Sequence, residues 1–344
     1  MKFAANCKAT GIGSVPYTDP AEAVGLVFDC FGKIPFWPQL PNLGFRENMY
    51  AQYSRSLPGL CLDKEKVVLN QAEAMEGLEG FYEKFLSEDL DQFKITEEFS
   101  QGLPEFLKQE NRLKKAAAIK GHITGPISFG LMVTFEDKRA VIYDDNLRDV
   151  IIKTLIRQAQ WQESIFRGIN PHTIIFVDEP YMSSFGSAFI NLERDQVIDI
   201  FNQVFDEISG LSAVHCCGNT DWGVLIDTNV DIINLDAFDC ADMFLLYPDR
   251  LKKFLQKGGI VAWGIVPTVT DKITPGAAPE LAERMEAIFD RIVAMGVERE
   301  RILAQSLITP SCGVGSLSVS LAREVFGQTA QVSKLLREKH SLED

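Results

Sequence analysis

Short apolar runs alternate with segments of helical periodicity throughout the second half of the chain. Residues 173–178 read Thr-Ile-Ile-Phe-Val-Asp, a nearly continuous apolar run typical of a parallel strand that is buried on both faces. Between such runs, apolar residues recur every three or four positions, as they do along one face of an α-helix. The pattern predicts strands at 173–178, 212–217, 231–236, 259–266 and 302–307, and helices at 195–210, 221–229, 249–257, 279–296 and 316–338.

The first half of the chain adds three strand candidates, at 9–16, 34–38 and 115–124. The second of these is weakened by its prolines. Asp19 followed by Pro20 predicts the start of a helix that continues to about Phe31, because aspartate caps helices and proline fits their first position.

The remaining segments of the first half are predicted to be helical. Residues 146–167 form the longest helical pattern in the chain. Residues 41–115 contain helical patterns near 65–87 and 96–110 and no clear strand, so we expect them to form an insertion over one face.

The order of these elements indicates the fold class. Eight strand candidates, each but the second followed by clear helical material, are what a (β/α)8 barrel requires. We therefore predict an α/β fold, a single TIM-barrel domain over residues 1–344 with a helical insertion (41–115) between strands 2 and 3. An open doubly wound sheet is the main alternative, but it would leave the last strand nowhere to close and no glycine-rich dinucleotide fingerprint supports it.

Unusual polar residues follow the predicted strands at their carboxyl ends. Strand one ends in Gly13-Ser14, strand four in Asp178-Glu179, and strand six in Asp236. Strand five ends in His215-x-Cys217, and strand eight continues toward Cys312. In a barrel these ends meet at the face that carries the active site, so we expect the residues to converge.

The histidine and two cysteines predict a zinc site. Imidazole and thiolate are ligands that zinc prefers, and the two-residue period of a strand points His215 and Cys217 to one side and Cys216 to the other. Three protein ligands leave one tetrahedral position open for a substrate, and two thiolates favour holding a substrate thiol over activating water. Two alternatives remain: the cysteines are packing residues, or the zinc is purely structural.

Taken together, the strand-end motifs resemble a known family. The chain is similar to the catalytic barrel of cobalamin-independent methionine synthase, in the superfamily shared with uroporphyrinogen decarboxylase and the methylcobalamin:coenzyme M methyltransferases. The resemblance covers nearly the whole chain, and the segments that carry it are Ile12-Gly13-Ser14, Gly125-Pro126, Asp178-Glu179-Pro180, His215-x-Cys217 and Ser311-Cys312-Gly313.

The resemblance implies a role for each site residue. His215, Cys217 and Cys312 would bind zinc, with Asp236 as fourth ligand in place of the family's longer glutamate. Gly13 and Ser14 would hold the carboxylate of an amino acid substrate, most simply homocysteine. Asp178 would pair with its ammonium group. Cys240 is a competing fourth ligand that we rank below Asp236, because it falls beyond the strand end.

Two departures from the family concern the methyl donor. The synthase has two similar barrels, whereas 344 residues suffice for one. The family's histidine after strand seven, which helps protonate a folate leaving group, has no counterpart in Trp263-Gly264-Ile265-Val266-Pro267. A methylcorrinoid leaves without needing a proton, so we expect methylcobalamin or a corrinoid protein as donor. The alternatives are a barrel that binds a corrinoid or thiol without turnover, and a decarboxylase, whose arginine-rich N-terminal motif is absent here.

Composition narrows the class of partner and the compartment. Acidic residues outnumber basic ones 48 to 34, giving a net charge of −14 without a basic block, which argues against nucleic-acid or membrane binding. Seven cysteines and the lack of a signal peptide predict a reducing, cytoplasmic setting.

His122 lies in an apolar strand and is more simply a core residue than a ligand.

Overall fold

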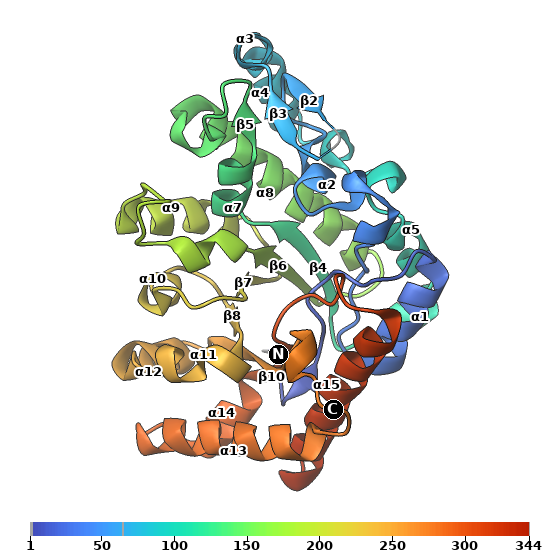
Figure 1. The fold of residues 1–344 in the computed structure, drawn as a ribbon, viewed down its shortest axis with the longest axis vertical. Coiled ribbons are helices and arrows are strands. Elements are labelled where there is room, and N and C mark those ends of the chain that lie inside the picture. The colour runs from blue at the N-terminus through green and yellow to red at the C-terminus, as the bar shows by residue number, and fades with distance from the viewer. Residues whose placement is uncertain (1–2, 64, 344) are drawn as a thin grey trace.

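The computed structural model describes residues 3–63 and 65–343. In this part of the chain, seven parallel strands form one curled sheet with helices packed around its outer face (Figure 1). In the order in which they pair, the strands are β1 (Lys8–Ala9), β10 (Ser306–Pro310), β9 (Ile260–Val266), β8 (Ile232–Leu235), β7 (Leu211–Cys216), β6 (Thr173–Asp178) and β4 (Ile119–Thr124).

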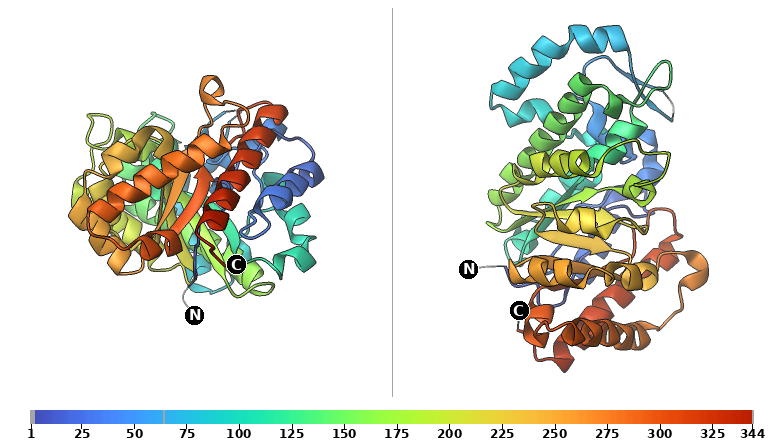
Figure 2. Two further views of the ribbon diagram at one scale, coloured as in Figure 1. Left: turned by 90° about the horizontal axis from the view of Figure 1, so that it is seen from below. Right: turned by 90° about the vertical axis from the view of Figure 1, so that its left-hand side faces the viewer.

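Helices connect successive strands and shield the sheet from solvent (Figure 2). They are α1 (Pro20–Phe31), α2 (Ala51–Ser54), α3 (Gln71–Glu76), α4 (Leu78–Leu86), α5 (Gly102–Leu107), α6 (Glu110–Leu113), α7 (Pro126–Met132), α8 (Asp145–Arg167), α9 (Arg194–Phe205), α10 (Trp222–Ile226), α11 (Ala237–Phe244), α12 (Pro248–Gln256), α13 (Ala278–Ala294), α14 (Arg299–Ala304) and α15 (Val319–Lys339). Short 3-10 helices are η1 (Pro41–Leu43), η2 (Phe45–Glu47), η3 (Leu90–Phe93), η4 (Glu97–Phe99), η5 (Val141–Tyr143), η6 (Pro180–Ser184) and η7 (Thr270–Lys272).

The segment expected as the second strand contacts both edges of the sheet without forming a regular strand. Phe36 bridges Lys120 on β4, and Gln39 bridges Ser14 beyond β1. Pro35 accepts a hydrogen bond from the Lys120 backbone, but Pro35 and Pro38 have no backbone N–H to donate. The prediction of a strand at 34–38 is therefore corrected to two isolated bridges.

The concave face of the sheet changes from apolar to polar along the strands. Toward the amino ends of the strands, this face carries a separate apolar cluster of Ala5, Ile34, Ala118, Ile174, Phe176, Ala213, Ile232, Ile260, Ala262 and Leu307. Two residues further along β6, β7, β8 and β10, the same face carries the buried polar side chains of Asp178, His215, Asn234 and Thr309, respectively. The carboxyl ends of the strands are thus the polar end of the sheet.

Several predicted boundaries are confirmed, but those of the first and last strands are wrong. The first strand, predicted at 9–16, comprises only Lys8–Ala9, and Ser14 beyond it forms an isolated bridge. Asp19 caps α1 by accepting a hydrogen bond from Ala21 N at 2.8 Å, as expected. The last strand, predicted at 302–307, begins only at Ser306, because Ile302 and Leu303 pack as the buried face of α14. Helices α7 and α11 were not predicted.

Segment 41–115 contains helices, as expected, but also a hairpin. Strands β2 (Leu60–Leu62) and β3 (Val67–Leu69) pair antiparallel, and β3 also pairs with β5 (Thr134–Phe135). The expectation of no strand there is wrong, because these runs are too short for their period to be recognised. With α3 and α4 the hairpin lies at one end of the molecule (Figure 1, top).

Within the described residues, no helix is long and apolar enough to cross a membrane.

Candidate metal centre

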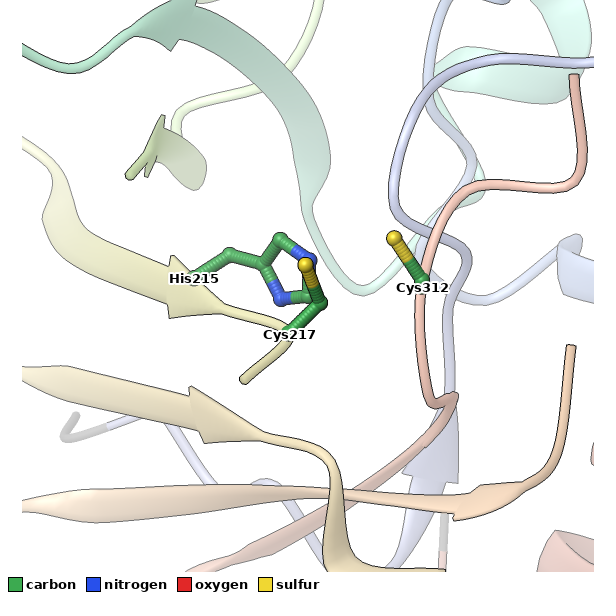
Figure 3. A group of neighbouring side chains, drawn as sticks. All are labelled: His215, Cys217 and Cys312. Atoms are coloured by element: carbon green, nitrogen blue, oxygen red, sulfur yellow. The ribbon is translucent and has the colours of Figure 1, made fainter. Parts of the chain in front are cut away.

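Three side chains from two distant parts of the chain converge at the polar end of the sheet. One nitrogen of His215 and the sulfur atoms of Cys217 and Cys312 all lie within 4.8 Å of one another. His215 and Cys217 extend from the end of β7, and Cys312 faces them from the loop that follows β10 (Figure 3). His215 is buried and the two cysteines are half-buried. The structure brings together the three residues that the sequence singled out.

Local features of the backbone position these side chains at the site. Cys216, between the two β7 residues, points the other way and packs in the main hydrophobic core. On β10 the pairing with β9 shifts register between Thr309 and Pro310, an irregularity that redirects the chain leading to Cys312. Gly264 on β9 leaves room for this path, since a Cβ there would lie 2.8 Å from the Ser311 Cα.

The hydrogen bonds of His215 leave one ring nitrogen available. Its Nδ1 lies 2.5 Å from Asn234 Oδ1. Its Nε2 is buried and has no hydrogen-bond partner among the described atoms. A buried nitrogen without a partner is costly, and a metal ion is one group that would satisfy it. The donor set, one imidazole and two sulfurs, fits zinc.

The two thiols influence each other strongly. The Cys312 thiol, then the His215 imidazole, stabilise a thiolate on Cys217 and lower its pKa. The Cys217 thiolate in turn raises the pKa of Cys312, and burial adds to this. Burial opposes a charge on His215, but the Cys217 thiolate and the Asp178 carboxylate outweigh it and raise its pKa. The site therefore stabilises a thiolate at Cys217, which is the form in which a cysteine binds a metal ion.

Asp178 lies beside this cluster, paired in register with His215 across β6 and β7. Burial raises its pKa, although His215 and Lys120 oppose the effect. Its Oδ1 is buried without a hydrogen-bond partner among the described atoms. Lys120 is fully buried deeper on β4, with its Nζ 4.2 Å from the centre of the Phe176 ring, and burial lowers its pKa to about 7.

His122 is a core residue, as expected, but its ring nitrogens are not paired. The ring stacks on Trp37 with centroids 4.1 Å apart, and neither nitrogen has a hydrogen-bond partner among the described atoms. Burial keeps its pKa well below the usual value, so the ring is neutral. It belongs to the polar end of the sheet without belonging to the metal cluster.

Gly13 and Ser14 lie against the loop that carries Cys312. Ser14 O accepts a hydrogen bond from Val314 N at 3.0 Å, and Ser14 Oγ accepts one from Gly315 N at 3.4 Å. A Cβ on Gly313 would lie 2.3 Å from Ser14 Oγ, so a larger residue at this position would require the serine hydroxyl to rotate. Their role in substrate binding stays a prediction.

Asp236 and Cys240 are not members of the three-residue cluster. Asp236 caps α11, where its Oδ1 accepts a hydrogen bond from Asp239 N at 2.9 Å, and burial raises its pKa to about 6. Cys240 is buried on α11. The identity of a fourth ligand stays a prediction.

Sequence reasoning missed two contributions to this end of the sheet. Asn234, which contacts His215, lies two residues before Asp236 in an otherwise apolar strand. A polar residue in such a strand is the sequence signal that could have identified it. Glu179 accepts hydrogen bonds from Ile127 N at 2.9 Å and Ser128 N at 2.8 Å, so it holds the start of α7. Only tertiary contacts reveal these roles.

Comparisons with known proteins show a shared fold. No family model matches the chain, and no curated protein matches it. A methyltransferase from Methanosarcina mazei is 10% identical, covers 99% of this chain and 95% of its own, and has a TM-score of 0.52. A B12-independent methionine synthase from Shewanella sp. W3-18-1, in complex with selenomethionine, is 19% identical over 69% of this chain and 67% of its own, with a TM-score of 0.47. At these identities, the similarity to the Methanosarcina protein shows a common architecture and no more.

Proposed function

We propose that this protein is a zinc-dependent methyltransferase that moves a methyl group onto a substrate thiol. The observation that carries the proposal is the convergence of His215, Cys217 and Cys312 within 4.8 Å at the carboxyl ends of the strands. The fold is shared with a methyltransferase, which is compatible with the proposal. The resemblance of the strand-end motifs to cobalamin-independent methionine synthase supplies homocysteine as the acceptor.

The three side chains would hold zinc, and Asp236 is proposed as a fourth ligand that a substrate sulfur joins or displaces. When bound, zinc lowers the pKa of a coordinated thiol, which is about 8.5 in the free state, so that the thiolate is present at neutral pH. His215 would coordinate through Nε2, which is buried without a hydrogen-bond partner among the described atoms.

The remaining residues of the site would bind the amino acid part of the substrate. Asp178 Oδ1, next to His215, is buried without a hydrogen-bond partner among the described atoms, and a substrate ammonium group would satisfy it. Ser14 presents a half-buried hydroxyl beside the Cys312 loop, where it can donate to a substrate carboxylate. These contacts would orient the sulfur toward the donor.

We propose a methylcorrinoid as donor, either methylcobalamin or a corrinoid protein. The thiol loses its proton to solvent on binding. The sulfur then attacks the methyl carbon, forming a carbon–sulfur bond, while the electron pair of the cobalt–carbon bond stays on cobalt. That leaving group requires no proton, which suits a chain without a histidine at 263–267.

We also propose that residues 34–39 complete the barrel as its eighth, irregular strand, within a single domain.

Metal content and methyl transfer test the proposal together. Protein purified without chelator should contain about one zinc per chain, and it should convert methylcobalamin and homocysteine to methionine with a change in the cobalamin spectrum. Cys312→Ser should lower zinc affinity and activity by at least about 100-fold, because it removes a ligand.

Cys61→Ser is the matched control, since Cys61 is exposed on β2, outside the cluster. Its zinc content and activity should equal those of the wild type. Wild-type protein with far less than one zinc per chain, unchanged by Cys312→Ser, would refute the zinc site. Zinc without any change in the cobalamin spectrum would indicate a binding protein or another donor.

A further inference from the structure

The side chain of Asn234 connects three strands around His215. It is fully buried on β8, and its Nδ2 donates to Ala262 O on β9 at 2.8 Å and to Thr309 Oγ1 on β10 at 2.8 Å. Its Oδ1 lies 2.5 Å from His215 Nδ1 on β7. Both amide hydrogens and the amide oxygen are therefore engaged.

This network determines which way the amide faces. Ala262 O is a backbone carbonyl and can only accept a hydrogen bond, so the amide nitrogen must face it. Asn234 Oδ1 is then directed at His215, and an amide oxygen also can only accept. His215 Nδ1 must consequently carry the hydrogen, which leaves the lone pair on Nε2.

Nε2 is the ring nitrogen that Asn234 does not contact. It is buried without a hydrogen-bond partner among the described atoms. A neutral histidine in water favours the opposite form, with the hydrogen on Nε2. That form could not bind a metal through Nε2, so a contact that reverses the preference has a chemical consequence.

We propose that Asn234 is a positioning residue that fixes His215 in the form with a bare Nε2. Through Thr309 it also ties the strand of His215 to β10, the strand that leads to Cys312. Asn234 would not touch substrate or metal. The part of the inference that concerns metal affinity rests on the proposed function, whereas the part that concerns the ring hydrogen does not.

Nitrogen-15 NMR of the imidazole groups tests the ring hydrogen directly in metal-free protein. The chain has four histidines, and His215→Gln identifies the signal of His215. At a pH at which the His215 ring is neutral, the wild type should show a protonated Nδ1 and an unprotonated Nε2. Finding the hydrogen on Nε2 in the wild type would overturn the proposal without any variant at Asn234.

Two substitutions separate the role of the Asn234 amide oxygen as an acceptor from that of its amide nitrogen as a donor. Asn234→Leu removes the acceptor, so the hydrogen should move to Nε2 in most molecules. Asn234→Asp keeps an acceptor and loses the donor to Ala262 O, so the hydrogen should stay on Nδ1. An Asn234→Leu protein that keeps it there would contradict the proposal.

Asn170→Leu is the matched control for loss of a buried amide. Asn170 is 3% exposed and donates to Leu113 O and Ala116 O, as Asn234 donates within its own network, but it lies outside the metal cluster. We expect Asn170→Leu to lower stability without moving the His215 hydrogen. A shift equal to that of Asn234→Leu would assign the effect to general destabilisation and reject the positioning role.

Zinc affinity, measured by competition with a chelator, completes the test. Asn234→Leu should weaken zinc binding by about 10- to 100-fold, the range typical of lost contacts to a ligating histidine, and Asn170→Leu should leave it within about twofold. Wild-type affinity in a folded Asn234→Leu protein would refute the positioning role while the proposed function stands. If the NMR result holds but no form of the protein binds zinc, the proposed function fails and the hydrogen placement stands.

Discussion

At the scale of single residues, Asp236 has one observed task and one proposed task. The observed task is to cap α11, with its Oδ1 accepting from Asp239 N at 2.9 Å. The proposed task is to be the fourth zinc ligand, which the resemblance implies and the three-residue cluster does not include. Asparagine caps helices as well as aspartate does, but it offers no anionic oxygen to a metal. Substitution can therefore separate the two tasks.

Asp236→Asn should lower zinc affinity by about tenfold or more while the metal-free protein keeps its stability, because the cap is retained. Asp236→Ala should in addition cost about 1 kcal/mol in the free energy of unfolding. Chelator competition and denaturant titration measure the two effects. Asp144→Asn, at the cap of α8, is the control and should change neither quantity. Unaltered zinc affinity in Asp236→Asn would leave Asp236 as a helix cap alone.

At the scale of elements, the path of the chain after β10 positions Cys312. The register shift between Thr309 and Pro310 coincides with a close approach of β9 and the outgoing loop at Gly264. A Cβ there would lie 2.5 Å from Leu235 O and 2.8 Å from the Ser311 Cα, and both are backbone atoms that cannot rotate away. A side chain at position 264 would therefore force the backbone next to Cys312 to move.

Gly264→Ala should displace the Cys312 loop and lower both zinc affinity and stability, the latter by about 1–3 kcal/mol as for other overpacked sites. Gly327→Ala is a suitable control, since no atom of the described residues beyond its own neighbourhood in the helix lies within 4 Å of a Cβ at that exposed position in α15. It should raise the free energy of unfolding by about 0.5–1 kcal/mol, because alanine suits a helix better than glycine. Normal zinc affinity in Gly264→Ala would show that the loop adapts.

At the scale of the whole molecule, the metal site is not what holds the fold together. One hydrophobic cluster extends from Cys7 to Leu336 and packs the helices against the outer face of the sheet, and a second fills its concave side. The cluster of His215, Cys217 and Cys312 lies beyond this second core, at the carboxyl ends of the strands. The folding free energy is therefore supplied mainly by apolar burial, and a metal adds to it only by binding.

Removing zinc with a chelator should leave the far-UV circular dichroism spectrum unchanged and abolish methyl transfer. The thermal midpoint should fall by no more than about 10 °C, because ligand binding adds only a few kcal/mol to a large domain. Adding zinc back should restore both properties. Unfolding on chelation would instead indicate a structural metal site, as in small zinc domains.

Much of the fold could be predicted from the pattern of apolar and polar residues along the sequence. The five parallel strands of the second half were predicted from apolar runs, and four of them lie within a residue or two of their predicted bounds. The last strand was misplaced because Ile302 and Leu303 suit a helix face as well as a strand. The hairpin β2–β3 was missed because three residues are too few to show a period.

The sequence by itself indicated that His215 and Cys217 stand at the end of a strand, because strand periodicity is local, whereas Cys312 lies beyond a strand whose bounds the sequence misplaced. Whether these residues meet depended on the curl of the sheet, which is a property of the whole chain. Tertiary structure alone decided that Asn234 faces His215 and that the three-residue cluster does not include Asp236. The physical reason is that hydrogen bonds across neighbouring strands join residues whose separation in sequence carries no periodic signal.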